Sequence, residues 1–148
     1  MGSQGCEKRT EEDDKMISRI DIYNYIESKV NLVTRPVYCS ARLENVPVEM
    51  PACYIVQIGE ASIENAYTFD YTDDQVERDF EIHVYSNLTN GALYQAEGIM
   101  ADVRTAMREL YFMESFVGRS DDVDPSLIHL VGRFHRVIGG SDTMPIST

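Results

Sequence analysis

The stretch Glu77-Arg-Asp-Phe-Glu-Ile-His-Val-Tyr-Ser86 decides the fold, because its apolar side chains occupy every second position. Phe80, Ile82 and Val84 fall on one side of an extended chain, while polar or aromatic residues fall on the other. A period of two over this length predicts a β-strand with one buried face. The rest of the chain is predicted to supply helices that pack on this strand and further strands of the same sheet.

A helix is predicted over Ala92–Leu110, directly after the turn-forming residues 87–91. Asn90 or Thr89 is expected to cap its first turn, because short polar side chains can accept from free backbone N–H groups. Apolar residues then recur at spacings of three and four, which indicates one buried stripe. The stripe consists of Ala92, Ala96, Ile99, Met100, Val103, Ala106, Met107 and Leu110.

The residues from Ser126 to Ile138 alternate again and predict a final strand. Strand, connecting helix and strand form one unit in which the helix is buried on the sheet. One predicted side of this last strand carries Ile128, Leu130, Gly132 and Phe134, and the other carries His129, Val131, Arg133, His135 and Val137. Gly132 is expected to mark a bulge or a close backbone approach.

The first half of the chain supplies a second helix and further strands. The helix is predicted to begin near Asp13 or Asp14 and to end at Asn31. Its expected apolar face is Met16, Ile20, Tyr23, Ile26 and Val30. An alternating strand is predicted over 37–44, and the apolar run 53–58 predicts a central strand.

These elements predict an α+β fold with a mixed, mostly antiparallel sheet and two helices packed on one face. The chain suits a single domain over residues 13–138, with a polar N-terminal arm (1–12) and a C-terminal tail (139–148). Ala66–Tyr71 is predicted to pair as a hairpin with the strand beginning at Glu77. That hairpin is either an arm that seeks a partner or an ordinary sheet edge.

The charge of the chain argues against binding to phosphate backbones. Asp and Glu number 25 and Lys and Arg 13, so the formal net charge is −12. Nucleic acid could therefore pass nearby without being gripped. No apolar run approaches the roughly 20 residues of a membrane-spanning helix.

The residues usual in catalysis are poorly placed for it. Cys53 lies within an apolar strand and is expected to be a core residue, and three widely spaced cysteines indicate reduced thiols. His129 and His135 are too far apart on one strand for a shared metal ion. No enzyme activity, cofactor or metal site is predicted.

Three segments resemble a known family. They are Pro51-Ala-Cys-Tyr-Ile-Val, Phe80-Glu-Ile-His-Val-Tyr-Ser-Asn and Ile128-His-Leu-Val-Gly-Arg-Phe-His-Arg-Val-Ile. Their order and spacing over residues 14–138 resemble the tail terminator or tail-completion proteins in the neck of long-tailed bacteriophages. The longer charged N-terminal arm and residues 113–124 depart from that pattern.

The resemblance implies a structural ring subunit at the head–tail junction of a siphophage-like virion, commonly a hexamer with an open channel. Its partners would be copies of itself, the tail tube protein and a head connector protein, with assembly in the cytoplasm of the bacterial host. DNA would pass without specific binding, and no membrane is involved. A small ligand-binding or regulatory α+β domain is the alternative.

The residues expected at an interface or channel lie in and beside the predicted hairpin. Carboxylates around a channel would let DNA slide by repulsion, since the phosphate backbone is also negative. The simpler alternative is that these acids are solvated loop charges, like Asp121, Asp122 and Asp124. The candidates are Asp70, Tyr71, Asp73, Asp74, Glu77 and Asp79.

Overall fold

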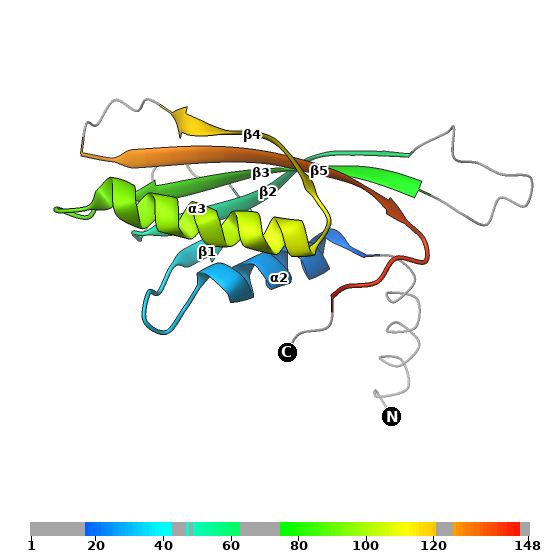
Figure 1. Ribbon diagram of the computed structural model, residues 1–148, viewed down its shortest axis with the longest axis horizontal. Coiled ribbons are helices and arrows are strands. Elements are labelled where there is room, and N and C mark those ends of the chain that lie inside the picture. Colours follow the sequence, from blue (N-terminus) through cyan, green and yellow to red (C-terminus); the bar gives the residue numbers. More distant parts are fainter. Residues whose placement is uncertain (1–16, 43–46, 48, 63–74, 121–125, 146–148) are drawn as a thin grey trace, which may run out of the picture.

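A computed structural model describes residues 17–42, 47, 49–62, 75–120 and 126–145 of the chain. In these residues two helices lie along one face of a five-stranded sheet (Figure 1), which confirms the predicted α+β class. The elements, in chain order, are α2 (Arg19–Val30), β1 (Tyr38–Ser40), β2 (Ala52–Ser62), β3 (Gln75–Ser86), α3 (Ala92–Glu109), β4 (Met113–Ser120) and β5 (Ile128–Gly139).

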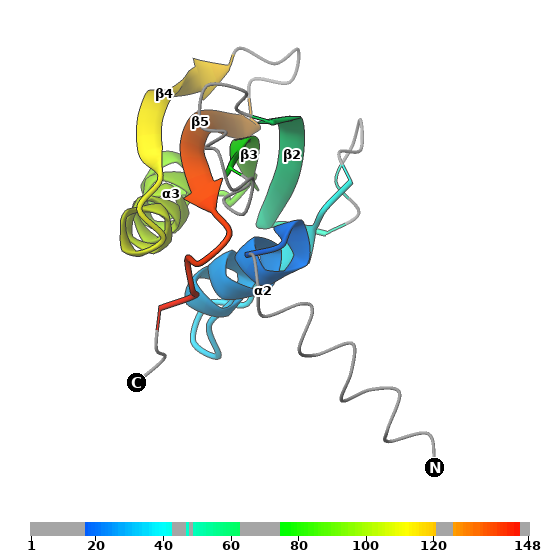
Figure 2. The same ribbon diagram turned by 90° about the vertical axis from the view of Figure 1, so that its right-hand side faces the viewer.

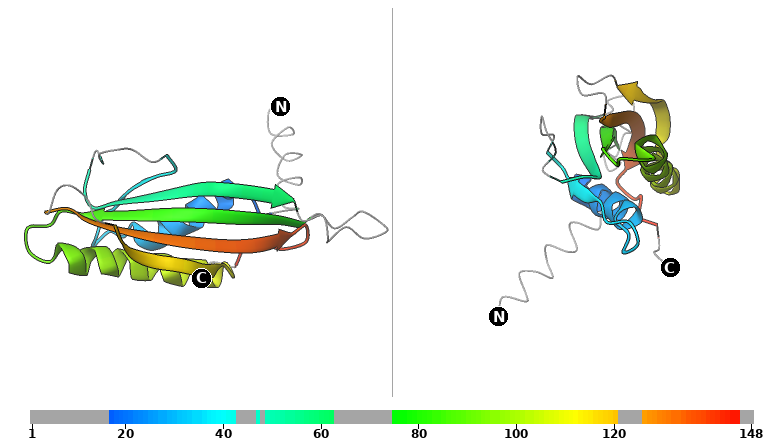
Figure 3. Two further views of the ribbon diagram at one scale, coloured as in Figure 1. Left: turned by 90° about the horizontal axis from the view of Figure 1, so that it is seen from above. Right: turned by 90° about the vertical axis from the view of Figure 1, so that its left-hand side faces the viewer.

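The sheet has the strand order β1-β2-β3-β5-β4, so the strand that decides the fold lies in its middle. β1 runs parallel to β2, and every other neighbouring pair is antiparallel. β3 and β5 pair without interruption from Gln75 opposite Gly139 to Ser86 opposite Ile128. Figure 3 (left) shows the strands side by side from the face that the helices leave free.

The main core lies between the sheet and the helices. Phe80, Ile82 and Val84 are fully buried there, as the period of two predicts. Val103 of α3 is also fully buried in the same cluster, which confirms the predicted packing of this helix on β3. Seen along the sheet in Figure 2, both helices lie on the same side of the strands.

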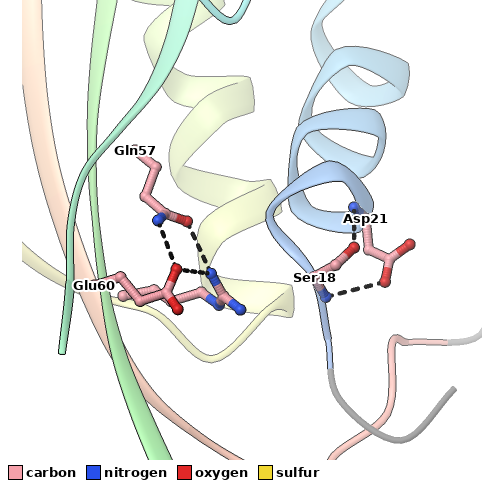
Figure 4. Close-up of polar contacts among 5 residues, drawn as sticks. Ser18, Asp21, Gln57 and Glu60 are labelled. Carbon is pink, nitrogen blue, oxygen red and sulfur yellow. Dashed lines mark hydrogen bonds and ion pairs between the residues drawn. The ribbon is translucent and has the colours of Figure 1, made fainter. Parts of the chain in front are cut away.

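The start of α2 differs from the prediction. Ser18 is the N-cap: its Oγ accepts from the backbone N–H of Asp21, whose carboxylate accepts from the N–H of Ser18, both at 3.1 Å (Figure 4). This capping box sets the first helical residue at Arg19, not near Asp13 or Asp14. The predicted end at Asn31 is confirmed.

Among the described residues, the buried face of α2 agrees with the predicted one except at Ile20. Ile22, Ile26 and Val30 are fully buried, whereas Ile20 is 60% exposed. Ile20 and Ile22 are two positions apart, and two helical steps place them on nearly opposite sides. Ile26 and Val30 of the predicted face are therefore confirmed as buried and Tyr23 packs against the core, whereas Ile22 is buried in place of Ile20.

The helix α3 begins without the predicted side-chain cap. Its N-cap is Gly91, which has φ 92° and makes no capping hydrogen bond through a side chain, so Asn90 and Thr89 do not cap it. A positive φ is readily adopted by glycine, which explains the residue type at this turn.

The sequence predicts no strand at β4, because residues 113–124 stand out only as a departure from the pattern of the phage neck proteins. It pairs with β5, and its register shifts between Glu114 and Phe116. A bulge of this kind interrupts the alternation by which strands are recognised. The connection from β3 to β5 therefore contains both the helix α3 and the edge strand β4. Met100 of α3 lies next to Gly132 of β5.

Two further predictions concern residues at the margins of the described structure. Ala66–Tyr71 lies in the segment 63–74, outside the described residues. In the predicted tail, Asp142 accepts from Arg136 and from the backbone N–H of Gly139, at 3.0 and 2.8 Å. Met144 packs against the main core, so this part of the tail returns to the domain.

Candidate functional site

The face of the sheet that carries no helix, here called the helix-free face, holds the two candidate residues that the structure describes. Glu77 and Asp79 occupy alternate positions of β3, on the opposite side from Phe80. They lie opposite Val137 and His135 of β5. Both are half-buried, and they share a shallow depression with Ile58, Ser115 and Arg133.

Asp70, Tyr71, Asp73 and Asp74 all lie in residues 63–74, outside the described structure. That segment joins β2 to β3, whose pairing ends with Ser62 opposite Val76. The structure therefore brings Glu77 and Asp79 together on one face, and their relation to the remaining four stays a prediction.

A connected chain of polar side chains occupies the middle of the helix-free face. Arg133 of β5 donates through Nε to Glu81 at 2.7 Å, and the other carboxylate oxygen of Glu81 contacts Nε2 of His83 at 2.7 Å. His83 Nδ1 lies 2.8 Å from His129 Nε2. Since one nitrogen must donate and the other accept, the two facing imidazole nitrogens hold one proton between them.

The electrostatics of this chain centre on Glu81. Burial acts to raise the pKa of its carboxyl, but hydrogen bonds from His83 and Arg133 outweigh burial and lower the pKa below its ordinary value. The Glu81 side chain is 17% exposed and its partner His83 is 9% exposed, whereas Arg133 is 58% exposed, so solvent screens the pair with Arg133 more strongly. The carboxylate is therefore held in place by two strands at once.

A second, smaller cluster of buried residues lies on the helix-free face next to the two histidines. The Tyr85 and His129 rings stack with centroids 4.1 Å apart, and Tyr85 meets Tyr54 edge-on at 5.7 Å. Ala52 and Tyr54 are fully buried, with Met50 and Leu127 packed against this cluster. The histidine pair thus lies at the boundary between a buried end and an exposed end of the same face.

Large apolar side chains are exposed at the other end of the helix-free face. Ile58, Met113, Phe116 and Val137 are between 44% and 66% exposed. Met113 and Phe116 belong to β4 and lie opposite His135 and Arg133. Several exposed apolar residues on one sheet face indicate a contact surface more than a catalytic centre.

The described residues offer little for catalysis. Cys53 is fully buried, and a side-chain hydrogen bond with Cys39 together with burial raises the pKa of its thiol well above the ordinary value. A thiol held protonated is a poor nucleophile. Among the described residues, no three His, Cys, Asp or Glu side chains gather where they could hold a metal ion.

No helix in the described ranges is both long enough and apolar enough to span a membrane.

The fold and the helix-free face together define a class: a single-domain α+β protein with a five-stranded mixed sheet and exposed apolar residues on one sheet face. No protein-family model matches the sequence, and no curated protein matches it significantly. A chain in a solved structure described as the virion of a native gene transfer agent particle is similar in fold, with a TM-score of 0.53 and 13% identity. The match covers 80% of the present chain and 92% of that chain, and at this identity it establishes the shared fold.

Sequence reasoning placed the three histidines on the polar side of their strands but did not bring two of them together. His83 lies opposite Val131 and is diagonal to His129, so their contact depends on the register between β3 and β5. The only sequence signal was the alternation that put Glu81, His83 and Tyr85 on one side. Alternation specifies a side of a strand, whereas the partner strand is specified by pairing.

Proposed function

We propose that this protein is a structural ring subunit at the head–tail junction of a tailed-phage-like virion, where it caps the tail tube and joins it to a head connector. The observation that carries the proposal is the fold likeness to a chain of a gene transfer agent virion. The likeness spans most of both chains, so the whole domain is compared and not a common sub-motif. The three segments that resemble phage neck proteins support it independently.

The surface of the domain fits a role in assembly. The exposed apolar residues of the helix-free face, together with the edge strand β4, provide area for contacts with neighbours. A contact that joins unlike surfaces of identical subunits generates a ring when the rotation closes. In this proposal the polar chain of Glu81, His83 and His129 has a structural role, since its members connect the two central strands.

The acidity of the chain fits a channel for DNA. A net charge of −12 per subunit would be multiplied around a ring, and a lumen with excess carboxylate repels phosphates. Glu77 and Asp79 are the described residues that we place toward this channel. In this proposal DNA passes through without specific binding and no catalysis takes place.

Reconstitution with the tail tube protein tests the proposal. We expect light scattering after size exclusion to show a closed homo-oligomer, and negative-stain images to show it seated on one end of each tube. Tubes assembled without this protein are the control and should show bare ends. A strict monomer at high concentration, both alone and with tube protein, would contradict the ring.

A further inference from the structure

A groove between α3 and β4 is an unused feature of the described structure. Its volume is about 580 Å³, within the range of ligand and side-chain pockets. Leu93 and Met100 of α3 face Val117 and Leu130 of the sheet across it, so its floor is apolar. The remaining lining residues are Glu97, Arg104, Gly118 and Arg119.

Among the described residues, the unpaired charges that line this groove are one positive, on Arg119, and one negative, on Glu97. Arg104 is engaged by Glu114 through two hydrogen bonds of 2.8 and 2.9 Å. Arg119 is exposed and has no ion pair or side-chain hydrogen bond among the described residues. Glu97 is the acidic member of the lining. An occupant with apolar side chains and a carboxylate would therefore bury its apolar side chains on the floor and form an ion pair with Arg119.

The outer edge of β4 offers backbone groups as well. β4 ends the strand order of the sheet, and no described strand pairs with its outer side. Such an edge accepts an extended segment as an additional strand, whose alternate side chains enter the adjacent pocket. The groove beside β4 is thus suited to an extended peptide.

Residues 63–74 have the matching chemistry. Tyr67, Phe69 and Tyr71 alternate, so in an extended chain they would lie on one side. The segment holds no Lys, Arg or His. Its carboxylates are Glu64, Asp70, Asp73 and Asp74.

The groove is out of reach of the same copy's segment. Leu130 at the groove pairs with Val84 of β3, and β3 begins at Gln75, where the segment ends. The distance along β3 is about 30 Å at the usual rise per residue. Because the segment is joined to Ser62 and Gln75, which lie at one end of the β2–β3 pair, a chain of twelve residues can reach at most about 20 Å from them.

We propose that the groove between α3 and β4 binds residues 63–74 of a second copy of this chain, with the aromatic side chains on the apolar floor and a carboxylate on Arg119. This proposal rests on the proposed ring and specifies its subunit contact. Each copy donates one segment and receives one, which is the head-to-tail arrangement that closes into a ring. It also assigns Asp70, Tyr71, Asp73 and Asp74 to the subunit interface and leaves Glu77 and Asp79 for the channel.

A mixing experiment with two defective variants tests this arrangement. The groove variant is Leu93→Glu with Arg119→Glu, and both positions are exposed. The segment variant replaces Tyr67, Phe69 and Tyr71 with Ser. Sedimentation velocity should show that wild type associates and that each variant alone associates at least about tenfold more weakly. The equimolar mixture should form one-to-one dimers and nothing larger, because only one intact contact can form.

Controls separate this contact from misfolding and from the proposed function. Arg42→Glu reverses an exposed arginine outside the groove and should associate as wild type does. Circular dichroism should show unchanged folding in every variant. Wild-type association by both variants, a mixture that stays monomeric, or a strictly monomeric wild type overturns the proposed contact. The neck function fails on a different result, namely a wild-type chain that leaves tail tubes uncapped.

Discussion

At the scale of single residues, Glu81 joins the two central strands through its side chain. Its carboxylate bonds to Arg133 on β5 and to His83 on its own strand, and His83 continues the chain to His129 on β5. A buried polar group that loses a partner costs about 1–3 kcal/mol. The stability of the pairing between β3 and β5 therefore depends on Glu81 being ionised.

We expect the ionised form of Glu81 to stabilise the fold, so that the free energy of unfolding decreases at acidic pH. Its folded-state pKa is lowered, so its contribution is fully present above the ordinary value of 4.5 and is lost as pH falls through the folded-state pKa. Glu81→Gln should lose about 2 kcal/mol at neutral pH and should show a shallower loss of stability below pH 4.5 than wild type. Urea unfolding between pH 7 and 3 measures this. Glu97→Gln, at an exposed position without a described ion pair, is the control and should follow wild type.

The second residue-scale prediction concerns Val103, which is fully buried between α3 and the sheet. Val103→Asp would place an unpaired charge in the core, and the cost exceeds the stability of an ordinary domain of this size. We expect circular dichroism to show no cooperative melt. Ala101→Asp, on the exposed side of the same helix, should cost less than about 1 kcal/mol. A native-like melt of Val103→Asp would mean that this face of α3 is not the buried one.

At the scale of elements, the absence of a side chain at Gly132 sets how closely α3 approaches the sheet. A Cβ atom there would lie 2.9 Å from Cε1 of Phe134 and 3.3 Å from the sulfur of Met100 on α3. Phe134 and Met100 are both almost fully buried, so neither can move aside easily. The sequence predicts a bulge or a close backbone approach at Gly132; the structure instead places two side chains close to it, and its pairing with β3 is regular.

Two glycine-to-alanine changes should have opposite effects on stability. Gly132→Ala overpacks the contact between β5 and α3 and should cost about 1–3 kcal/mol. Gly98→Ala, within α3, meets only Nη1 of Arg35 at an ordinary 3.7 Å and should gain about 0.5–1 kcal/mol. Thermal or urea unfolding of the two variants measures both. Equal effects at the two positions would show that the α3–β5 contact is looser than the described distances indicate.

The edge strand β4 shows why an element can be present without a recognisable pattern. The residues Met113 to Phe116 are all exposed, so no burial constrains their alternation. The bulge between Glu114 and Phe116 then shifts the side chains by one position relative to β5. β4 forms because its backbone pairs with the edge of β5. That edge is present only once β5 has joined the sheet.

At the scale of the whole molecule, the proposed channel makes a prediction about DNA. Glu77→Lys with Asp79→Lys changes the local charge by two units at each position, or four per subunit. A ring repeats that change around one opening, so the lumen should attract phosphates. Because both positions are half-buried, each change should cost about 1 kcal/mol, the usual size for a single substitution.

Fluorescence anisotropy with a labelled duplex would reveal the new binding. We expect the double variant to bind at low salt and to release DNA as salt rises, while wild type binds at neither condition. Glu27→Lys with Glu49→Lys makes the same change of charge on α2 and before β2, away from the proposed lumen, and should bind much more weakly. Equal binding by the two double variants would show that Glu77 and Asp79 do not line a channel.

The sequence alone determined the local geometry of the central elements. Alternation over residues 80–84 and helical spacing over 92–110 identified which side chains are buried, because one buried face imposes the period of its own secondary structure. The α+β class followed from the order of these elements. Alternation also put Glu77 and Asp79 on the same side as Glu81 and His83.

Which strands pair and which helix faces pack on them follows from the tertiary structure and not from local sequence patterns. The stripe that α2 buries, the presence of β4, the contact of His83 with His129 and the groove between α3 and β4 all depend on neighbours distant in sequence. Local patterns carry no information on strand order or register, because every strand with the same alternation is an equally good partner. The long-range packing of this sheet and its helices selects one arrangement, and the candidate contact surfaces are a consequence of that selection.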